Sequence, residues 1–139
     1  MFMSDSALAS WAPRMLSVLR IVVALLYLQH GLTKFFGFPG QAPASMPFFP
    51  VILAGLIEVV GSILLLIGLF SRPAAFIMSG EMAVAYWYSH FPRNPFPYNN
   101  GGNLAIVYCF VFLYIFFAGP GPWSVDAVRR QESRRPAVT

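Results

Sequence analysis

Four runs of mostly apolar residues alternate with short segments of proline, glycine and polar residues along the chain. A helix needs ~20 such residues to cross the hydrocarbon core of a bilayer, so the chain has room for four crossings and short loops. Helices are predicted at about residues 16–36, 51–70, 73–90 and 103–118. Because helices joined by short loops alternate in direction, we expect an all-α fold, an integral membrane antiparallel four-helix bundle.

Proline and glycine interrupt the pattern where these helices are predicted to end. The loop after the first helix contains Pro39, Pro43, Pro47 and Pro50. Proline lacks a backbone donor and clashes with the preceding turn, so this loop cannot continue a helix. Residues 1–13 are expected to form a short tail near the membrane interface. A polar and basic tail over residues 124–139 is expected to carry a short surface helix at residues 125–132.

The composition agrees with the membrane class. Hydrophobic residues make up 58% of the 139 residues and charged residues only 10%. The mean hydropathy is +0.65. Soluble domains carry about 25% charged residues, so this chain could not cover a water-facing surface in the usual way. We expect a single membrane domain over residues 1–139, because no segment between the apolar runs is long enough to fold alone.

The positive residues are distributed unevenly about the four predicted crossings. One side carries the larger group, Arg14, Arg20, Arg72, Arg129, Arg130, Arg134 and Arg135. The other side carries only Lys34 and Arg93. Because lysine and arginine favour the cytoplasmic side, both termini and the basic tail are predicted to be cytoplasmic. The arginines flank apolar segments, so this orientation explains the formal charge of +4 better than a nucleic-acid partner does.

Ionisable residues inside the apolar runs form the candidate site. They are Arg20, His30, Lys34, Glu58 and Glu81. Ionisable groups are expensive in lipid, so we expect these side chains to face the bundle interior and to find partners there. At 100° per residue, one face of the first helix is made of Arg20, Ala24, Tyr27, Gly31 and Lys34.

Both glutamates lie on helix faces that let a neighbouring helix approach closely, because most of the other residues on these faces are small. The face of Glu58 includes Ala54, Gly55, Gly61 and Ser62. The face of Glu81 includes Ala74, Met78, Ala85 and Tyr88. Both carboxylates are therefore predicted to point into the bundle rather than into lipid.

Depth along the helices indicates which charges can meet. Arg20 lies near the cytoplasmic boundary, and Lys34 lies roughly 20 Å above it. We expect Glu58 to pair with His30 or Lys34, and Glu81 to pair with Arg20. Two interpretations remain open: the pairs hold the helices in register, or they form a site that binds a polar headgroup such as a quinone or relays protons.

Other kinds of site find little support in the residue pattern. The single cysteine, Cys109, excludes an internal disulfide and a C-x-x-C redox pair. No Cys–His cluster or carboxylate motif has metal-ligand spacing, so no metal site is expected. Haem ligation by His30 and His90 is disfavoured, because His90 ends its helix on the face opposite Glu81.

Several short motifs follow one another along nearly the whole chain. They are R-x9-H-G-x2-K (Arg20, His30, Gly31, Lys34), then Glu58, Gly61, Gly68, Arg72 and Glu81, the run NNGGNLA, and the closing AGPGPWSVD. In these motifs the chain resembles the DoxX family of small integral membrane proteins. One departure is Asn103, where many relatives have an acidic residue before the fourth helix. No role is therefore assigned to a carboxylate at that position.

The resemblance implies a four-helix protein of the bacterial cytoplasmic (inner) membrane. Members of the family are linked to membrane redox complexes. Some resemble subunits of thiosulfate- or quinol-linked oxidoreductases, and others are proposed to anchor soluble thiol or superoxide-handling enzymes. The family name itself implies no particular reaction.

We therefore expect a membrane subunit or accessory protein of a redox system, which is quinone- or thiosulfate-linked or acts in oxidative stress. The alternative is a non-catalytic anchor or scaffold whose basic tail docks a cytoplasmic partner. The expected partners are the lipid bilayer, other subunits of a redox complex, a soluble cytoplasmic enzyme or a second copy of the chain. No catalytic residue is assigned, and a quinone is the candidate ligand of the polar cluster.

Overall fold

The computed structural model describes residues 4–41 and 48–134, so Pro43, Pro47 and Arg135 lie outside the described residues. In these ranges the chain is all-helical and has no strand. The long helices are α1 (Asp5–Phe36), α2 (Phe48–Ile67), α3 (Ser71–Ala85) and α5 (Asn103–Ala118). The shorter elements are a π-helical turn, η1 (Tyr86–His90), α4 (Pro97–Asn100) and α6 (Val125–Ser133). The predicted all-α class and the short helix in the basic tail are confirmed.

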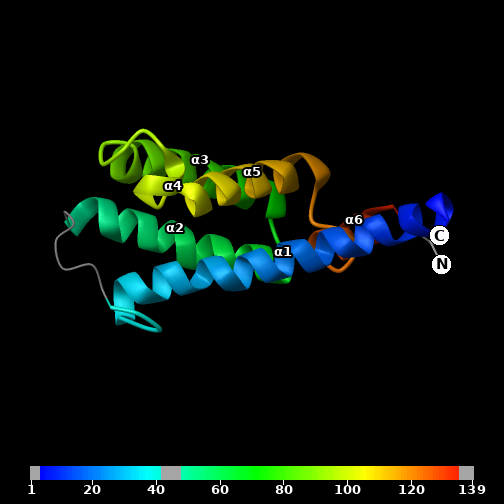
Figure 1. Ribbon diagram of the computed structural model, residues 1–139. Helices are drawn as coiled ribbons and strands as arrows, with labels where there is room; N and C mark the ends of the chain where they lie inside the picture. Colours follow the sequence, from blue (N-terminus) through cyan, green and yellow to red (C-terminus); the bar gives the residue numbers. More distant parts are fainter. Residues whose placement is uncertain (1–3, 42–47, 135–139) are drawn as a thin grey trace.

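The long helices are arranged as two pairs (Figure 1). Helix α1 packs along α2, α3 packs along α5, and the two pairs meet mainly where α2 contacts α3. Helices α1 and α5 make few contacts with each other. After α5 the chain crosses to the other pair, and α6 lies beside the first half of α1 (Figure 1). We call this end of the molecule, where the α2–α3 turn and residues 119–134 meet α1, the basal end.

The outer surface of the helices is apolar, as contact with lipid requires. Large apolar side chains are exposed along every long helix, including Leu25, Leu53, Val60, Ile77 and Phe110. Helices α1 and α2 are long and apolar enough to cross a membrane, with mean hydropathies of 1.7 and 2.5 over their most apolar stretches. Helix α5 is apolar but has 16 residues, about 24 Å of helix. Length and composition therefore identify two candidate spans in the described part of the chain.

Helix α1 begins at Asp5 rather than near residue 16. The Ser4 side chain caps its first turn by accepting the N–H of Ala7 at 3.3 Å. Asp5 adds a negative charge where the helix dipole favours one. Because this capped turn stands before Pro13, the proline lies inside the helix instead of marking its start. The expectation of a tail before α1 is wrong over the described residues.

The third apolar run ends in a π-helical turn after Ala85. The N–H of Phe91 donates to the carbonyl of Tyr86 at 2.9 Å, five residues back, as in a π-helix. The buried face of α3 runs through Met78 and Met82 to Tyr86, whereas Tyr88 lies on another side of the helix and is 65% exposed. The prediction that Tyr88 shares the buried face of Glu81 is therefore wrong.

A buried arginine fastens the basal end. Arg20 of α1 is 0% exposed. Its guanidinium donates to the backbone carbonyls of Leu65, Leu66 (2.9 Å), Pro120 (2.8 Å) and Trp123. The first two carbonyls lie at the end of α2, where the helix dipole favours a cation. The other two belong to the segment after α5, so one side chain joins three separate parts of the chain.

Two glycines let the backbone pass close to this arginine. Gly68 and Gly121 have φ values of 73° and 77°, which glycine adopts without steric cost. A Cβ on Gly121 would overlap the hydroxyl of Ser17 in α1, and a Cβ on Gly68 would overlap Ser124. The Ser17 hydroxyl in turn accepts the N–H of Trp123 at 3.1 Å. The segment after α5 is therefore held against α1 by backbone contacts as well as by the arginine.

Replacing Arg20 with Met should destabilise the protein strongly, because it leaves buried carbonyls without donors. Hydrogen bonds to a charged group contribute about 1.5–3 kcal/mol each, so losing the equivalent of two of the four bonds should cost roughly 3–6 kcal/mol. Thermal unfolding in detergent, followed by circular dichroism, measures the effect. Arg93→Met, at an exposed loop arginine, is the matched control and should unfold like the wild type. Equal unfolding temperatures for both variants would show that the basal end does not depend on Arg20.

Candidate functional site

An ion pair between Lys34 of α1 and Glu58 of α2 forms the centre of the polar cluster. The side chain of Glu58 is 1% exposed and that of Lys34 is 18% exposed. The two helices approach closely beside it, since a Cβ on Gly31 would lie only 3.1 Å from the carbonyl of Gly55. Of the two partners that the sequence predicts for Glu58, the structure selects Lys34. The small-residue face of α2 is confirmed as the buried one.

One oxygen of the Glu58 carboxylate, Oε2, has no hydrogen-bond partner among the described residues. The hydroxyl of Ser62, one turn further along α2, is also buried without a partner there. A buried polar atom left unpaired costs about 1–3 kcal/mol, and a charged one costs more. These two atoms are therefore available to hydrogen-bond a ligand that reaches the interior.

Glu81 of α3 accepts a hydrogen bond from the hydroxyl of Tyr27 in α1. Tyr27 is 0% exposed, on the face of α1 that the sequence assigns to the interior. The predicted pairing of Glu81 with Arg20 is wrong. Arg20 lies two turns before Tyr27, about 10 Å away along the helix axis, and its three guanidinium nitrogens donate to backbone carbonyls of the basal end.

Aromatic rings from two helices surround the Tyr27 side chain. Its ring centroid lies 5.1 Å from that of Tyr108 and 4.9 Å from that of Phe112, both in α5. The ring of His30 is exposed, with its centroid 5.8 Å from Tyr27 and 5.9 Å from Tyr108. His30 thus lies at the rim between α1 and α5 rather than in the interior. Sequence reasoning missed Tyr108 and Phe112, although their i, i+4 spacing places both on one face of α5.

The two histidines contact different parts of the molecule. The Nδ1 atom of His90 lies 3.0 Å from the carbonyl oxygen of Asn100, and its ring stacks on Tyr86. The Nδ1 atom of His30 lies 3.3 Å from the carbonyl oxygen of Leu26, within its own helix. Within residues 4–41 and 48–134, no three His, Cys, Asp or Glu side chains are grouped as metal ligands.

The cluster combines groups of opposite hydrogen-bonding character. Lys34 carries three donors, of which one is directed to Glu58. Glu58 offers a free acceptor in Oε2, and the Tyr27–Glu81 pair adds a phenol bound to a carboxylate. Such a site can bind a ligand that donates at one atom and accepts at another.

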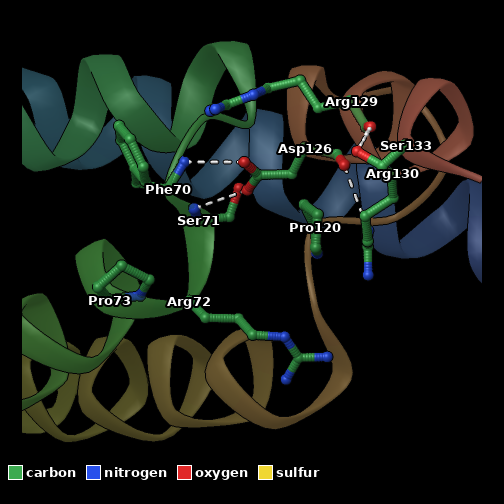
Figure 2. Close-up of a pocket in the computed structure, with 9 residues that line it drawn as sticks. All are labelled: Phe70, Ser71, Arg72, Pro73, Pro120, Asp126, Arg129, Arg130 and Ser133. Carbon is green, nitrogen blue, oxygen red and sulfur yellow. Dashed lines mark hydrogen bonds between the residues drawn. The ribbon is translucent and has the colours of Figure 1, made fainter.

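A second polar region lies at the basal end (Figure 2). The carboxylate of Asp126 in α6 accepts the N–H groups of Phe70 (3.0 Å) and Ser71 (2.8 Å) at the start of α3. No side chain from the adjoining residues caps α3, so Asp126 supplies the cap from a distant part of the chain.

Partial burial raises the pKa of Asp126, but the hydrogen bonds from Ser71 and Phe70 and the charge of Arg130 outweigh it. The net effect is a pKa below its ordinary value.

An all-helical chain with an apolar surface and ionisable groups inside its apolar helices is an integral membrane protein. The DoxX family model matches residues 15–91. A protein of Haemophilus influenzae described as uncharacterized is 45% identical over 127 residues, which cover 86% of this chain and 93% of the relative. Inner membrane protein YphA of Escherichia coli K12 is 32% identical over 127 residues, or 82% of this chain and 89% of YphA.

This chain belongs to the DoxX family and is an inner membrane protein. The resemblance that its motifs predict is therefore confirmed. No solved structure matches the chain.

Replacing Asp126 with Asn should remove a pH-dependent part of the stability. Folding lowers the pKa of Asp126, so its contribution is present at neutral pH and is lost as the pH falls through the folded-state pKa. The variant should therefore be less stable than the wild type at neutral pH, by the roughly 0.5–2 kcal/mol of a helix cap. In strong acid, where Asp126 is protonated, the wild type and the variant should have nearly equal stabilities.

Thermal unfolding of both proteins across this pH range tests the prediction. Subtracting the variant from the wild type cancels the other titrating groups, so the difference reports Asp126. A difference that stays constant on acidification would contradict the assignment of Asp126 as the cap of α3.

Proposed function

We propose that this chain is an accessory subunit of a membrane redox system and that its polar cluster binds the headgroup of a quinol or quinone. The observation that supports this most directly is the free Oε2 of Glu58, a buried acceptor beside a cation. The electron-transfer step belongs, in this proposal, to the other subunits of the system. The family resemblance to subunits of quinol-linked complexes supports the same assignment.

The two redox forms of the headgroup would use different members of the ion pair. A quinol hydroxyl donates, so it would bind Oε2 of Glu58; a quinone carbonyl accepts, so it would bind the ammonium of Lys34. The ring would pack against Tyr27 and Tyr108, whose ring centroids lie 5.1 Å apart beside Glu81. His30, at the rim between α1 and α5, would lie where the headgroup enters from the bilayer.

The proposed topology has four crossings, made by α1, α2, the continuous rod of α3 and η1, and α5. Both termini and the basal end then face the cytoplasm, as the positive residues favour. The cluster lies in the outer half of the membrane. It covers roughly 10 Å of depth from Tyr27 to Lys34, whereas a proton relay must cross about 30 Å of hydrocarbon. We therefore favour headgroup binding over a relay.

Replacing Glu58 with Gln should weaken binding of a reduced short-chain ubiquinol. The variant keeps the shape of the side chain but loses the charge, and a hydrogen bond to a charged group contributes about 1.5–3 kcal/mol, so affinity should fall roughly tenfold or more. Binding is measured by titration of the purified protein in lipid nanodiscs. The control is Glu132→Gln, at an exposed glutamate of α6, which should bind like the wild type.

A double variant separates a binding role from a structural one. Lys34→Met with Glu58→Gln removes both charges, and removal of both partners of a buried pair is often close to neutral for stability. We expect this protein to accumulate in the membrane and to fail in ubiquinol binding. If it binds ubiquinol as the wild type does, the ion pair only holds α1 and α2 in register.

The alternative function is a membrane anchor that docks a cytoplasmic partner through its basic tail. The exposed Arg129 and Arg130 of α6 support it. A chain that ends at Asp126 keeps the carboxylate that caps α3 but lacks the basic residues. If the protein is an anchor, the shortened chain should lose a soluble partner, whereas the Glu58→Gln variant should retain it. Quantitative mass spectrometry of the purified complexes measures the amount of bound partner. Retention by the shortened chain would exclude docking through the tail.

A further inference from the structure

A cavity of about 420 Å³ lies at the basal end between the start of α3 and α6 (Figure 2). Arginines from both helices line it: Arg72 from α3, and Arg129 and Arg130 from α6. Asp126 is the acidic residue in its wall. The wall therefore carries three positive charges against one negative charge.

The three arginines are held in place by partners that do not neutralise them. Arg72 donates to two backbone carbonyls at the end of α5. The Nε atom of Arg130 donates to the backbone carbonyl of Asp126 at 3.2 Å. The guanidinium of Arg129 lies 5.7 Å from the centroid of the Phe70 ring. In the part of the chain that the structure describes, none of the three forms an ion pair with a carboxylate.

The carboxylate of Asp126 does not occupy the cavity as a counter-ion would. Both of its oxygens accept backbone N–H groups, from Phe70 and Ser71. Figure 2 shows these two hydrogen bonds directed toward the start of α3. The carboxylate thus places α6 beside α3. The arginine donors that bind no backbone carbonyl, such as Nη2 of Arg72 and the Nη atoms of Arg130, remain for an anion.

Apolar side chains also line the cavity. Phe70, in its wall, is 54% exposed. Pro73 and Pro120 lie in the same wall. A short helix with neighbouring apolar and basic residues is typical of a segment that lies in the membrane interface. The cavity therefore combines a cationic wall with an apolar rim.

We propose that this basal cavity binds the phosphate group of an anionic phospholipid, held by Arg72, Arg129 and Arg130. The planar guanidinium matches the geometry of phosphate oxygens and binds them in bidentate fashion. Phe70 and Pro73, in the wall of the cavity, contact the upper part of the acyl chains. A free phosphate ion has the same charge but no apolar part, so the apolar rim favours the lipid. This site is separate from the polar cluster and does not depend on the proposed quinone binding.

Native mass spectrometry of the full chain in detergent, titrated with phosphatidylglycerol or phosphatidylcholine, tests this proposal. The wild type should prefer phosphatidylglycerol. In the double variant Arg129→Gln with Arg130→Gln, the ratio of the affinities for phosphatidylglycerol and phosphatidylcholine should fall roughly tenfold or more. Each interfacial arginine raises the affinity for an anionic lipid about fivefold. Arg14→Gln with Arg93→Gln, which removes two arginines outside the cavity, is the matched control and should retain the preference.

Two further measurements identify the ligand. Replacing Arg129 and Arg130 with Lys keeps the charges but removes the guanidinium fork, so part of the preference should remain. Inorganic phosphate, added at the lipid concentration, should not displace phosphatidylglycerol. The proposal is overturned if the double Gln variant keeps the preference while circular dichroism shows it folded. It is also overturned if inorganic phosphate displaces the lipid, since the cavity would then be a site for small anions.

Discussion

The buried guanidinium of Arg20 is the interaction on which the rest of this structure depends. An arginine can be buried without a carboxylate because its five donors can be satisfied by several carbonyls at once. Here those carbonyls come from the end of α2 and from the segment after α5. The same contact places residues 120–123 against α1 and thereby fixes where α6 begins. Because α6 begins there, it can border the basal cavity. Because Arg20 is satisfied at the basal end, Glu81 accepts its hydrogen bond from Tyr27 instead.

The hydrophobic pattern predicts much of this arrangement, because helix faces follow a period of 3.6 residues. It predicts the buried face of α1 from Arg20 to Gly31 and the small-residue face of α2. It also predicts His30 or Lys34 as the partner of Glu58, and the structure has Lys34. It does not predict the partner of Glu81. Backbone carbonyls have no signature in the sequence, so nothing in the pattern shows that Arg20 is already satisfied at the basal end. In the sequence, Tyr27 looks like an ordinary aromatic core residue, and nothing marks its hydroxyl as the donor to Glu81.

Other features escape sequence reasoning because the hydrophobic period does not record helix caps or a change of helix type. The cap of α3 comes from Asp126, 55 residues after Ser71, although local rules look for a cap within the first turn. The π-helical turn at Tyr86–His90 cannot be read from a hydrophobic pattern that assumes one constant helical period. The start of α1 at Asp5 depends on the cap that Ser4 supplies, which the prediction of a tail over residues 1–13 did not include.

The two interpretations of the Lys34–Glu58 pair differ in what they require of the second carboxylate oxygen. A pair that only holds two helices in register is most favourable when every buried oxygen is satisfied, because an unsatisfied one adds to the desolvation cost. Oε2 of Glu58 has no partner in the described residues, and Ser62 repeats the feature one turn away. Polar atoms left unsatisfied in an otherwise consistent structure are expected at functional sites, where a ligand completes the hydrogen bonds. This reasoning favours a binding role for Glu58, with the ion pair orienting the carboxylate that receives the headgroup.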